Sequence, residues 1–165
     1  MTTPPFQLAE PVVRDVPAFT GLTAAARLAL PQIPIFAEQA STDLMRLADA
    51  HRLPLVAAPV FIYTGPGTGG HDLVTLQIAL PVPPEAEFSS PDERYALKTF
   101  DAFHCLGFLY RGPITHLGDA YPIAMNELRA RGHTPMEQSR EVYQRWIAYD
   151  SPDNQVEIQF GIAAK

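Results

Sequence analysis

Apolar and polar residues alternate most regularly along residues 73–82, where the apolar positions are Val74, Leu76, Ile78 and Leu80. A period of two with one apolar face predicts a half-buried strand. The same alternation returns in residues 155–163, where the apolar positions are Val156, Ile158, Phe160 and Ile162. Shorter runs rich in branched and aromatic residues predict further strands over residues 59–64 and 141–149.

Two longer stretches predict strands that are interrupted. Pro17 and Gly21 indicate that a strand over residues 11–22 is bent or lies at the edge of a sheet. Residues 94–111 are long for a single strand, so we expect a break near Asp101.

Two other stretches repeat apolar residues every three or four positions, as amphipathic helices do. The first covers residues 33–51 and is followed by Pro54, which stops a helix. The second lies between Thr115, a candidate N-cap, and Gly132, a candidate glycine just past the C-terminal end. Pro122 removes one internal hydrogen bond, which predicts either a kink or a late start of this helix.

The order strand, helix, strand, strand occurs twice. Residues 74–80 overlay residues 156–162 at a shift of 82 positions, and Val60 overlays Val142 at the same shift. We interpret this as an internal duplication, about 11–82 and 94–163, within one domain over residues 1–165. Two such halves, related by a pseudo-twofold axis, predict an α+β fold with one antiparallel sheet, both helices on one side and a central ligand cleft.

Composition and charge narrow the classes of function. The chain of 165 residues has the size of one domain, and its 18 acidic against 12 basic residues give a net charge of −6, which argues against direct binding of nucleic acid. No apolar run approaches the roughly 20 residues that span a bilayer, and the first ten residues show no export signal. The single cysteine, Cys105, fits a reducing cytoplasm, the expected location.

No cofactor or metal is expected. The five histidines show none of the spacings that metal sites use. Residues Gly65–Gly70 are rich in glycine but lack the Lys-Ser/Thr ending of a phosphate loop and precede a strand, so a hairpin loop is the favoured interpretation.

The last predicted strand contains the main candidate for a functional residue. Its apolar residues face one side, and Glu157, Gln159 and Gly161 face the other. The position equivalent to Glu157 in the first half is Thr75, so the fold does not require an acid there. In a short, apolar, central strand the Glu157 carboxylate would be poorly solvated and would need a partner. The alternative is a solvated glutamate on an exposed face of a strand.

Aromatic residues cluster on the predicted strands around this position. As a set they could form a cage that stacks on flat ligands or holds cations, with Glu157 adding charge complementarity and Gln159 beside it. Taken one at a time, each is more simply explained as part of the core. The candidate ligand-binding aromatic residues are Phe61, Tyr63, Phe108, Tyr110, Tyr143, Trp146 and Tyr149.

Three short motifs, in order, resemble the GyrI-like, AraC-type effector-binding domains, a family that includes the multidrug-sensing domains of BmrR-like regulators. They are Tyr110-Arg111-Gly112-Pro113 before a helix, then Glu141-Val142-Tyr143, then Glu157-Ile158 on the final strand. The resemblance implies paired strand–helix–strand–strand modules around a ligand cleft. It also implies that Glu157 contacts the ligand. Since the first strand begins by about residue 11, we expect a stand-alone domain with no helix-turn-helix.

Three functions remain open at this point. The leading one is binding of an apolar or aromatic small molecule, either neutral or cationic. The second, drawn from stand-alone relatives, is hydrolysis of reactive cyclopropane-bearing or other electrophilic compounds, with Glu157 as general base and Tyr110 or Tyr143 polarising the leaving group. The third is interaction with a protein partner such as gyrase or a separate regulator, although the acidic residues form no dense run.

Overall fold

The computed structural model describes residues 4–65 and 73–164, so most of the predicted loop Gly65–Gly70 lies outside the described residues. The chain divides into two compact units. The central unit is Pro17–Ala102, and the terminal unit combines Met1–Val16 with Phe103–Lys165. Each unit is built from antiparallel strands and one long helix, which confirms the α+β class.

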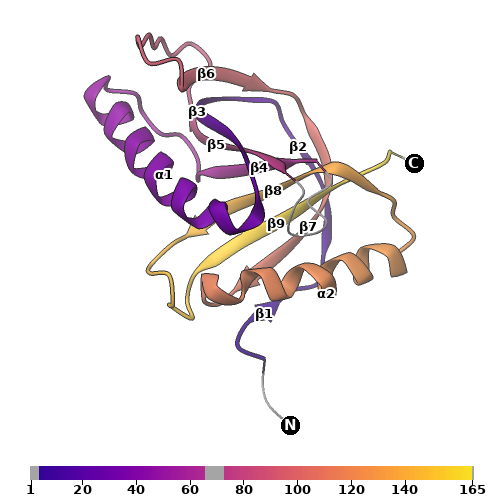
Figure 1. The fold of residues 1–165 in the computed structure, drawn as a ribbon. Coiled ribbons are helices and arrows are strands. Elements are labelled where there is room, and N and C mark those ends of the chain that lie inside the picture. Colours follow the sequence, from indigo (N-terminus) through magenta and orange to yellow (C-terminus); the bar gives the residue numbers. More distant parts are fainter. Residues whose placement is uncertain (1–3, 66–72, 165) are drawn as a thin grey trace. The chain divides into compact units, whose positions relative to one another are not determined.

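The central unit follows the predicted order strand, helix, strand, strand and then adds one further strand (Figure 1). Its elements are β3 (Phe19–Leu28), α1 (Ile33–Ala50), β4 (Val60–Thr64), β5 (Val74–Val82) and β6 (Tyr95–Phe100). All neighbours pair antiparallel, in the order β4-β5-β3-β6. The buried residues of α1, which are Ala40, Leu44 and Ala48, pack on the face of β5 that carries Leu76 and Ile78. The alternation in β5 therefore separates the helix-covered face from the other face.

The terminal unit repeats this order with two short strands added from the N-terminal segment. Its elements are β1 (Gln7–Leu8), β2 (Val12–Val16), β7 (Phe103–Arg111), α2 (Leu117–Ala130), β8 (Pro135–Arg145) and β9 (Gln155–Ile162). Strand β9 lies between β8 and β7, and β1 and β2 both pair with the other edge of β7. Every pairing is antiparallel.

The core of the terminal unit lies between α2 and one face of its strands. Four residues of the helix are buried against four of β9: Leu117, Ala120, Ala124 and Leu128 against Val156, Ile158, Phe160 and Ile162. The predicted division of β9 is confirmed, because its apolar residues face α2 and Glu157 and Gln159 face away. We call these two sides of the strands the helix face and the outer face.

Both predicted interruptions are present. Each one separates a strand of the terminal unit from a strand of the central unit. The first stretch breaks at Pro17 into β2 and β3, and the second breaks at residues 101–102 into β6 and β7. Strand β2 pairs with β7, whereas β3 pairs with β6. The unit boundaries therefore fall inside the two predicted strands. The common order of elements is a structural fact, and descent from a duplicated sequence stays a prediction.

The second helix and the strand after it differ from the predictions in detail. Helix α2 continues through Pro122 and does not start late, and Thr115 is not its N-cap but lies in a short 3₁₀ turn, Ile114–His116. Gly132 follows the helix with φ of 81°, a left-handed conformation in which glycine is strongly favoured, as predicted. Strand β8 begins at Pro135, six residues before the predicted start at Glu141.

Candidate functional site

Glu157 is a buried carboxylate on the outer face of the terminal unit. The residue is 4% exposed, and its Oε1 atom lies 2.9 Å from Nε of Arg14. The same oxygen accepts a hydrogen bond of 2.8 Å from Nε2 of Gln159. The sequence predicted that this carboxylate would need a partner, but it did not identify Arg14, which belongs to the edge strand β2.

The backbone of β7 leaves room for this carboxylate at Gly107. A Cβ atom at Gly107 would lie 2.8 Å from Oε1 of Glu157 and 3.3 Å from Nε of Arg14. The register explains the arrangement, since Gly107 lies opposite Gln159 on β9 and opposite Val12 on β2. A side chain at this position would displace the Glu157 carboxylate from its two partners.

Two further polar groups are buried on the same face. Arg140, opposite Gln159 in the β8–β9 register, is 3% exposed, and its guanidinium carbon lies 4.1 Å from the centre of the Phe103 ring. Desolvation lowers the pKa of Arg140. Cys105 is fully buried, and desolvation, with a smaller contribution from the charge of Glu157, raises its pKa to about 12. The thiol is therefore protonated at neutral pH and is a poor nucleophile.

Raised pKa values predict that the free energy of unfolding falls as the pH rises from about 9 to about 12. The pKa of Cys105 rises from 9.0, and that of Tyr110 from 10.0, to about 12 in the folded chain, so the unfolded chain loses these protons first. Each titrating group lowers stability by at most about 1.4 kcal/mol per pH unit. Urea unfolding at pH 8, 9, 10 and 11 measures the slope. Cys105→Ala should flatten it, and an unchanged slope would contradict the assignment to this thiol.

The structure does not bring the predicted tyrosines to Glu157. Tyr110 and Phe108 lie on the helix face of β7, fully or almost fully buried. The Tyr110 hydroxyl donates to the carbonyl of Pro113 at 2.5 Å, and its ring stacks on Phe6 at 5.3 Å. Desolvation, with a smaller contribution from the charge of Asp119, raises the pKa of Tyr110 to about 12. Tyr110 is thus a core residue on the face opposite Glu157.

The other four aromatic candidates form two groups. Phe61 and Tyr63 pack against the core of the central unit. Trp146 and Tyr149 follow the end of β8 and are 59% and 53% exposed. Phe108, Tyr110 and Tyr143 do not form the predicted cage around Glu157, because strand alternation places them on the opposite face.

Asn154 organises the loop that carries the two exposed aromatic residues. It is fully buried, and its side-chain oxygen accepts the backbone N–H of Ile147 at 2.8 Å. Its side-chain amide donates to the carbonyls of Ala148 at 2.7 Å and Ser151 at 3.2 Å. This single side chain fixes the turn between β8 and β9.

A second buried carboxylate, Glu141, lies on the helix face. It is 4% exposed and accepts hydrogen bonds from the hydroxyls of Tyr121, on α2, and Tyr143, two residues along β8. The Tyr143 bond is 2.7 Å long. The Tyr121 ring packs edge-on against Phe160 with centres 5.6 Å apart. Glu141 is therefore held in an aromatic environment, between two tyrosine hydroxyls that are themselves partly buried.

Glu141 was not among the predicted site residues, because the predicted strand began at that position. With β8 starting at Pro135, Glu141 lies in the middle of the strand, opposite Ile158, and must face α2. The signal was the spacing of Glu141 and Tyr143, two positions apart on one face of a strand, with Tyr121 on the preceding helix.

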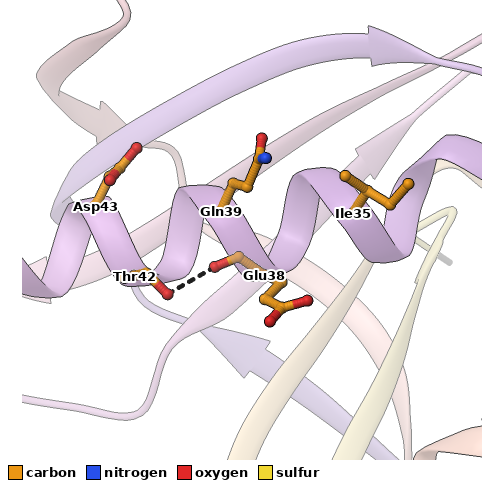
Figure 2. A pocket seen from close by; sticks show the side chains of 5 residues that line it. All are labelled: Ile35, Glu38, Gln39, Thr42 and Asp43. Carbon is orange, nitrogen blue, oxygen red and sulfur yellow. Dashed lines mark hydrogen bonds between the residues drawn. The ribbon is translucent and has the colours of Figure 1, made fainter.

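The structure has two surface hollows, and neither Glu141 nor Glu157 is among the residues that line them. One, of about 490 Å³, runs along the exposed side of α1, where Thr42 donates a hydrogen bond to the carbonyl of Glu38 (Figure 2). The other, of about 410 Å³, lies in the terminal unit, and its lining includes Leu8, Leu109 and Gln155. Within residues 4–65 and 73–164, no group of three metal-binding side chains could hold an ion, and no helix could cross a membrane.

Comparison with known proteins shows similarity in structure only. No family model and no curated protein matches the sequence. The chain is similar to EcmrR in a DNA complex, with a TM-score of 0.74 and 16% identity over 96% of this chain, which spans 57% of the EcmrR chain. It is also similar to the separate C-terminal domain of EcmrR, with a TM-score of 0.72 and 16% identity over 96% of this chain and 98% of that domain.

Two further solved structures share the architecture. SAV2435 bound to tetraphenylphosphonium matches with a TM-score of 0.63 and 15% identity over 94% of both chains. A hydrolase from Listeria innocua matches with a TM-score of 0.66 and 12% identity over 93% of this chain and 92% of that chain. Together these likenesses confirm the GyrI-like effector-binding fold that the sequence motifs predicted.

Proposed function

We propose that this protein binds small organic cations with apolar or aromatic surface and that Glu141 is the carboxylate that contacts them. The observation that carries the proposal is the pair of tyrosine hydroxyls, Tyr121 and Tyr143, that hold the buried Glu141 carboxylate. Aromatic rings attract cations through their faces, and a carboxylate in a water-poor site adds direct charge attraction. This combination favours a cation whose charge is spread over apolar groups.

Glu157 is the weaker candidate for this contact. Its carboxylate already has a cationic partner, Arg14, and an amide partner, Gln159. The aromatic residues Phe108, Tyr110 and Tyr143 lie on the opposite face of the strands. Hydrolysis with Glu157 as general base stays a prediction, but neither Tyr110 nor Tyr143 shares its face. The likeness to SAV2435 bound to tetraphenylphosphonium supports a ligand of the cationic class and supplies the probe.

Calorimetric titration with tetraphenylphosphonium tests the proposal. Glu141→Gln keeps the shape of the side chain and removes its charge, so we expect the affinity to fall at least tenfold, the equivalent of about 1.4 kcal/mol. Glu157→Gln is the matched control, because Glu157 is also a buried glutamate but lies on β9 and faces the other way. This variant should bind tetraphenylphosphonium like the wild type. Equal binding by Glu141→Gln, or loss of binding in Glu157→Gln alone, would contradict the assignment.

Tyr143→Phe tests how much the hydroxyl group beside Glu141 contributes to binding, apart from the charge of the carboxylate. This variant keeps the ring and removes the hydroxyl that donates to Glu141. We expect a smaller loss of affinity than in Glu141→Gln, because the negative charge remains. Absence of binding in the wild type would overturn the proposed function as a whole.

A further inference from the structure

A row of polar residues crosses the strands of the terminal unit at one end of its outer face. Arg111, the last residue of β7, lies directly opposite Gln7 on β1 and opposite Gln155 on β9. Directly paired residues of antiparallel strands share a face and have Cβ atoms about 5 Å apart. The register therefore places the Arg111 side chain between those of two glutamines. Arg145, the last residue of β8, lies opposite Gln155 and extends the row with a second arginine.

Most hydrogen-bond donors of this row are unused within residues 4–65 and 73–164. Arg111 makes one ion pair there, from Nη2 to Oδ1 of Asp153 at 2.8 Å, and the two side chains are 50% and 48% exposed. The side chains of Gln7, Gln155 and Arg145 have no hydrogen-bond or ion-pair partner in the same ranges. Because a half-exposed ion pair contributes little to stability, a second carboxylate can join or replace Asp153 at the guanidinium.

The surface at this row is hollowed. The hollow of about 410 Å³ in the terminal unit is lined by Gln7, Leu8, Ala9, Leu109, Arg111 and Gln155. Arg111 carries the only charge among these six residues. Leu109 lies two residues before Arg111 on the same face, and its carbonyl accepts the backbone N–H of Ala9 at 2.9 Å. An apolar surface therefore adjoins the row of donors. Glu157 lies opposite Leu109, but it does not line the hollow and its charge is paired with Arg14.

This combination of groups suits a carboxylate that carries an apolar substituent. The planar guanidinium of arginine presents parallel N–H donors that match the two oxygens of a carboxylate, and glutamine amides donate to the same oxygens. We propose that the hollow binds organic carboxylates with an aryl or alkyl group, that Arg111 contacts the carboxylate, and that Gln7 and Gln155 flank it as donors. The site takes anions, whereas the site at Glu141 takes cations, so it does not rest on that proposed function.

The experiment is a titration with cinnamate, an aryl carboxylate, followed by heteronuclear NMR. We expect saturable binding, with the largest chemical-shift changes at residues 7–9, 109–111 and 155, which line the hollow or lie between lining residues. Cinnamamide has nearly the same shape without the charge, so it should bind about tenfold more weakly. Equal binding of the two compounds would contradict recognition of the carboxylate.

Two substitutions test the role of the guanidinium. Arg111→Met keeps the length of the stem and removes the donors, so the affinity for cinnamate should fall about tenfold. Asp153→Asn removes the carboxylate that competes for Arg111, so cinnamate should bind about threefold more tightly. Arg129→Met is the matched control, because Arg129 is an exposed arginine of the same unit on α2, and it should bind like the wild type.

Four results would overturn this proposal. They are no binding of cinnamate by the wild type, unchanged affinity in Arg111→Met, weaker binding in Asp153→Asn, and an equal loss in Arg129→Met, which would show a general charge effect. Arg111→Gln provides a second variant if Arg111→Met does not fold, as judged by circular dichroism. Arg111→Met should leave the binding of tetraphenylphosphonium unchanged, so failure of this site and failure of the site at Glu141 are distinguishable.

Discussion

Phe108→Ala is expected to lower the free energy of unfolding by about 4 kcal/mol, because the ring is 1% exposed and its removal leaves a cavity beneath α2. The ring also packs edge-on against Phe160, with centres 6.0 Å apart. Urea unfolding at neutral pH measures the loss. Trp146→Ala is the control, since the exposed indole should contribute about 0.5 kcal/mol or less.

This comparison separates two roles for the aromatic residues. If Phe108 lined an open ligand site, its removal would cost little stability and much affinity. A loss below about 1 kcal/mol for Phe108→Ala would therefore contradict its place in the core.

Asn154→Ala is expected to lower the free energy of unfolding by about 3 kcal/mol. The substitution leaves the backbone N–H of Ile147 and the carbonyl of Ala148 without their partners in a buried turn, and each such group costs about 1–3 kcal/mol. Chemical unfolding of the variant measures the effect. Asn126→Ala, at an exposed position of α2, should change stability by about 0.5 kcal/mol or less. Equal effects of the two substitutions would show that the turn does not depend on Asn154.

The order of elements could be predicted because hydrophobic periodicity is a local property. The alternation of Val156, Ile158 and Phe160 determines which face of β9 meets α2, and the structure confirms it. Proline has an equally local effect, which is why the break at Pro17 was predictable. In α2, in contrast, tertiary packing of Ala120 and Ala124 outweighs the hydrogen bond lost at Pro122, so the helix continues.

The partners of the site residues were not predictable, because they depend on strand pairing over long distances in sequence. Arg14 reaches Glu157 only because β2 leaves the strand that follows it and pairs with β7, and no periodicity encodes that exchange. The position of two predicted cage residues was not predictable for a related reason. The motifs suggested that Tyr110 and Tyr143 surround Glu157. The strand register instead places both tyrosines on the opposite face of the strands, with Tyr143 beside Glu141.

The Glu141 proposal is tested most directly by a crystal structure of the protein with tetraphenylphosphonium. The account predicts electron density for the cation in contact with the Glu141 carboxylate and at least one of the rings of Tyr121 and Tyr143. Density for the cation beside Glu157, or on a surface away from both glutamates, would contradict it.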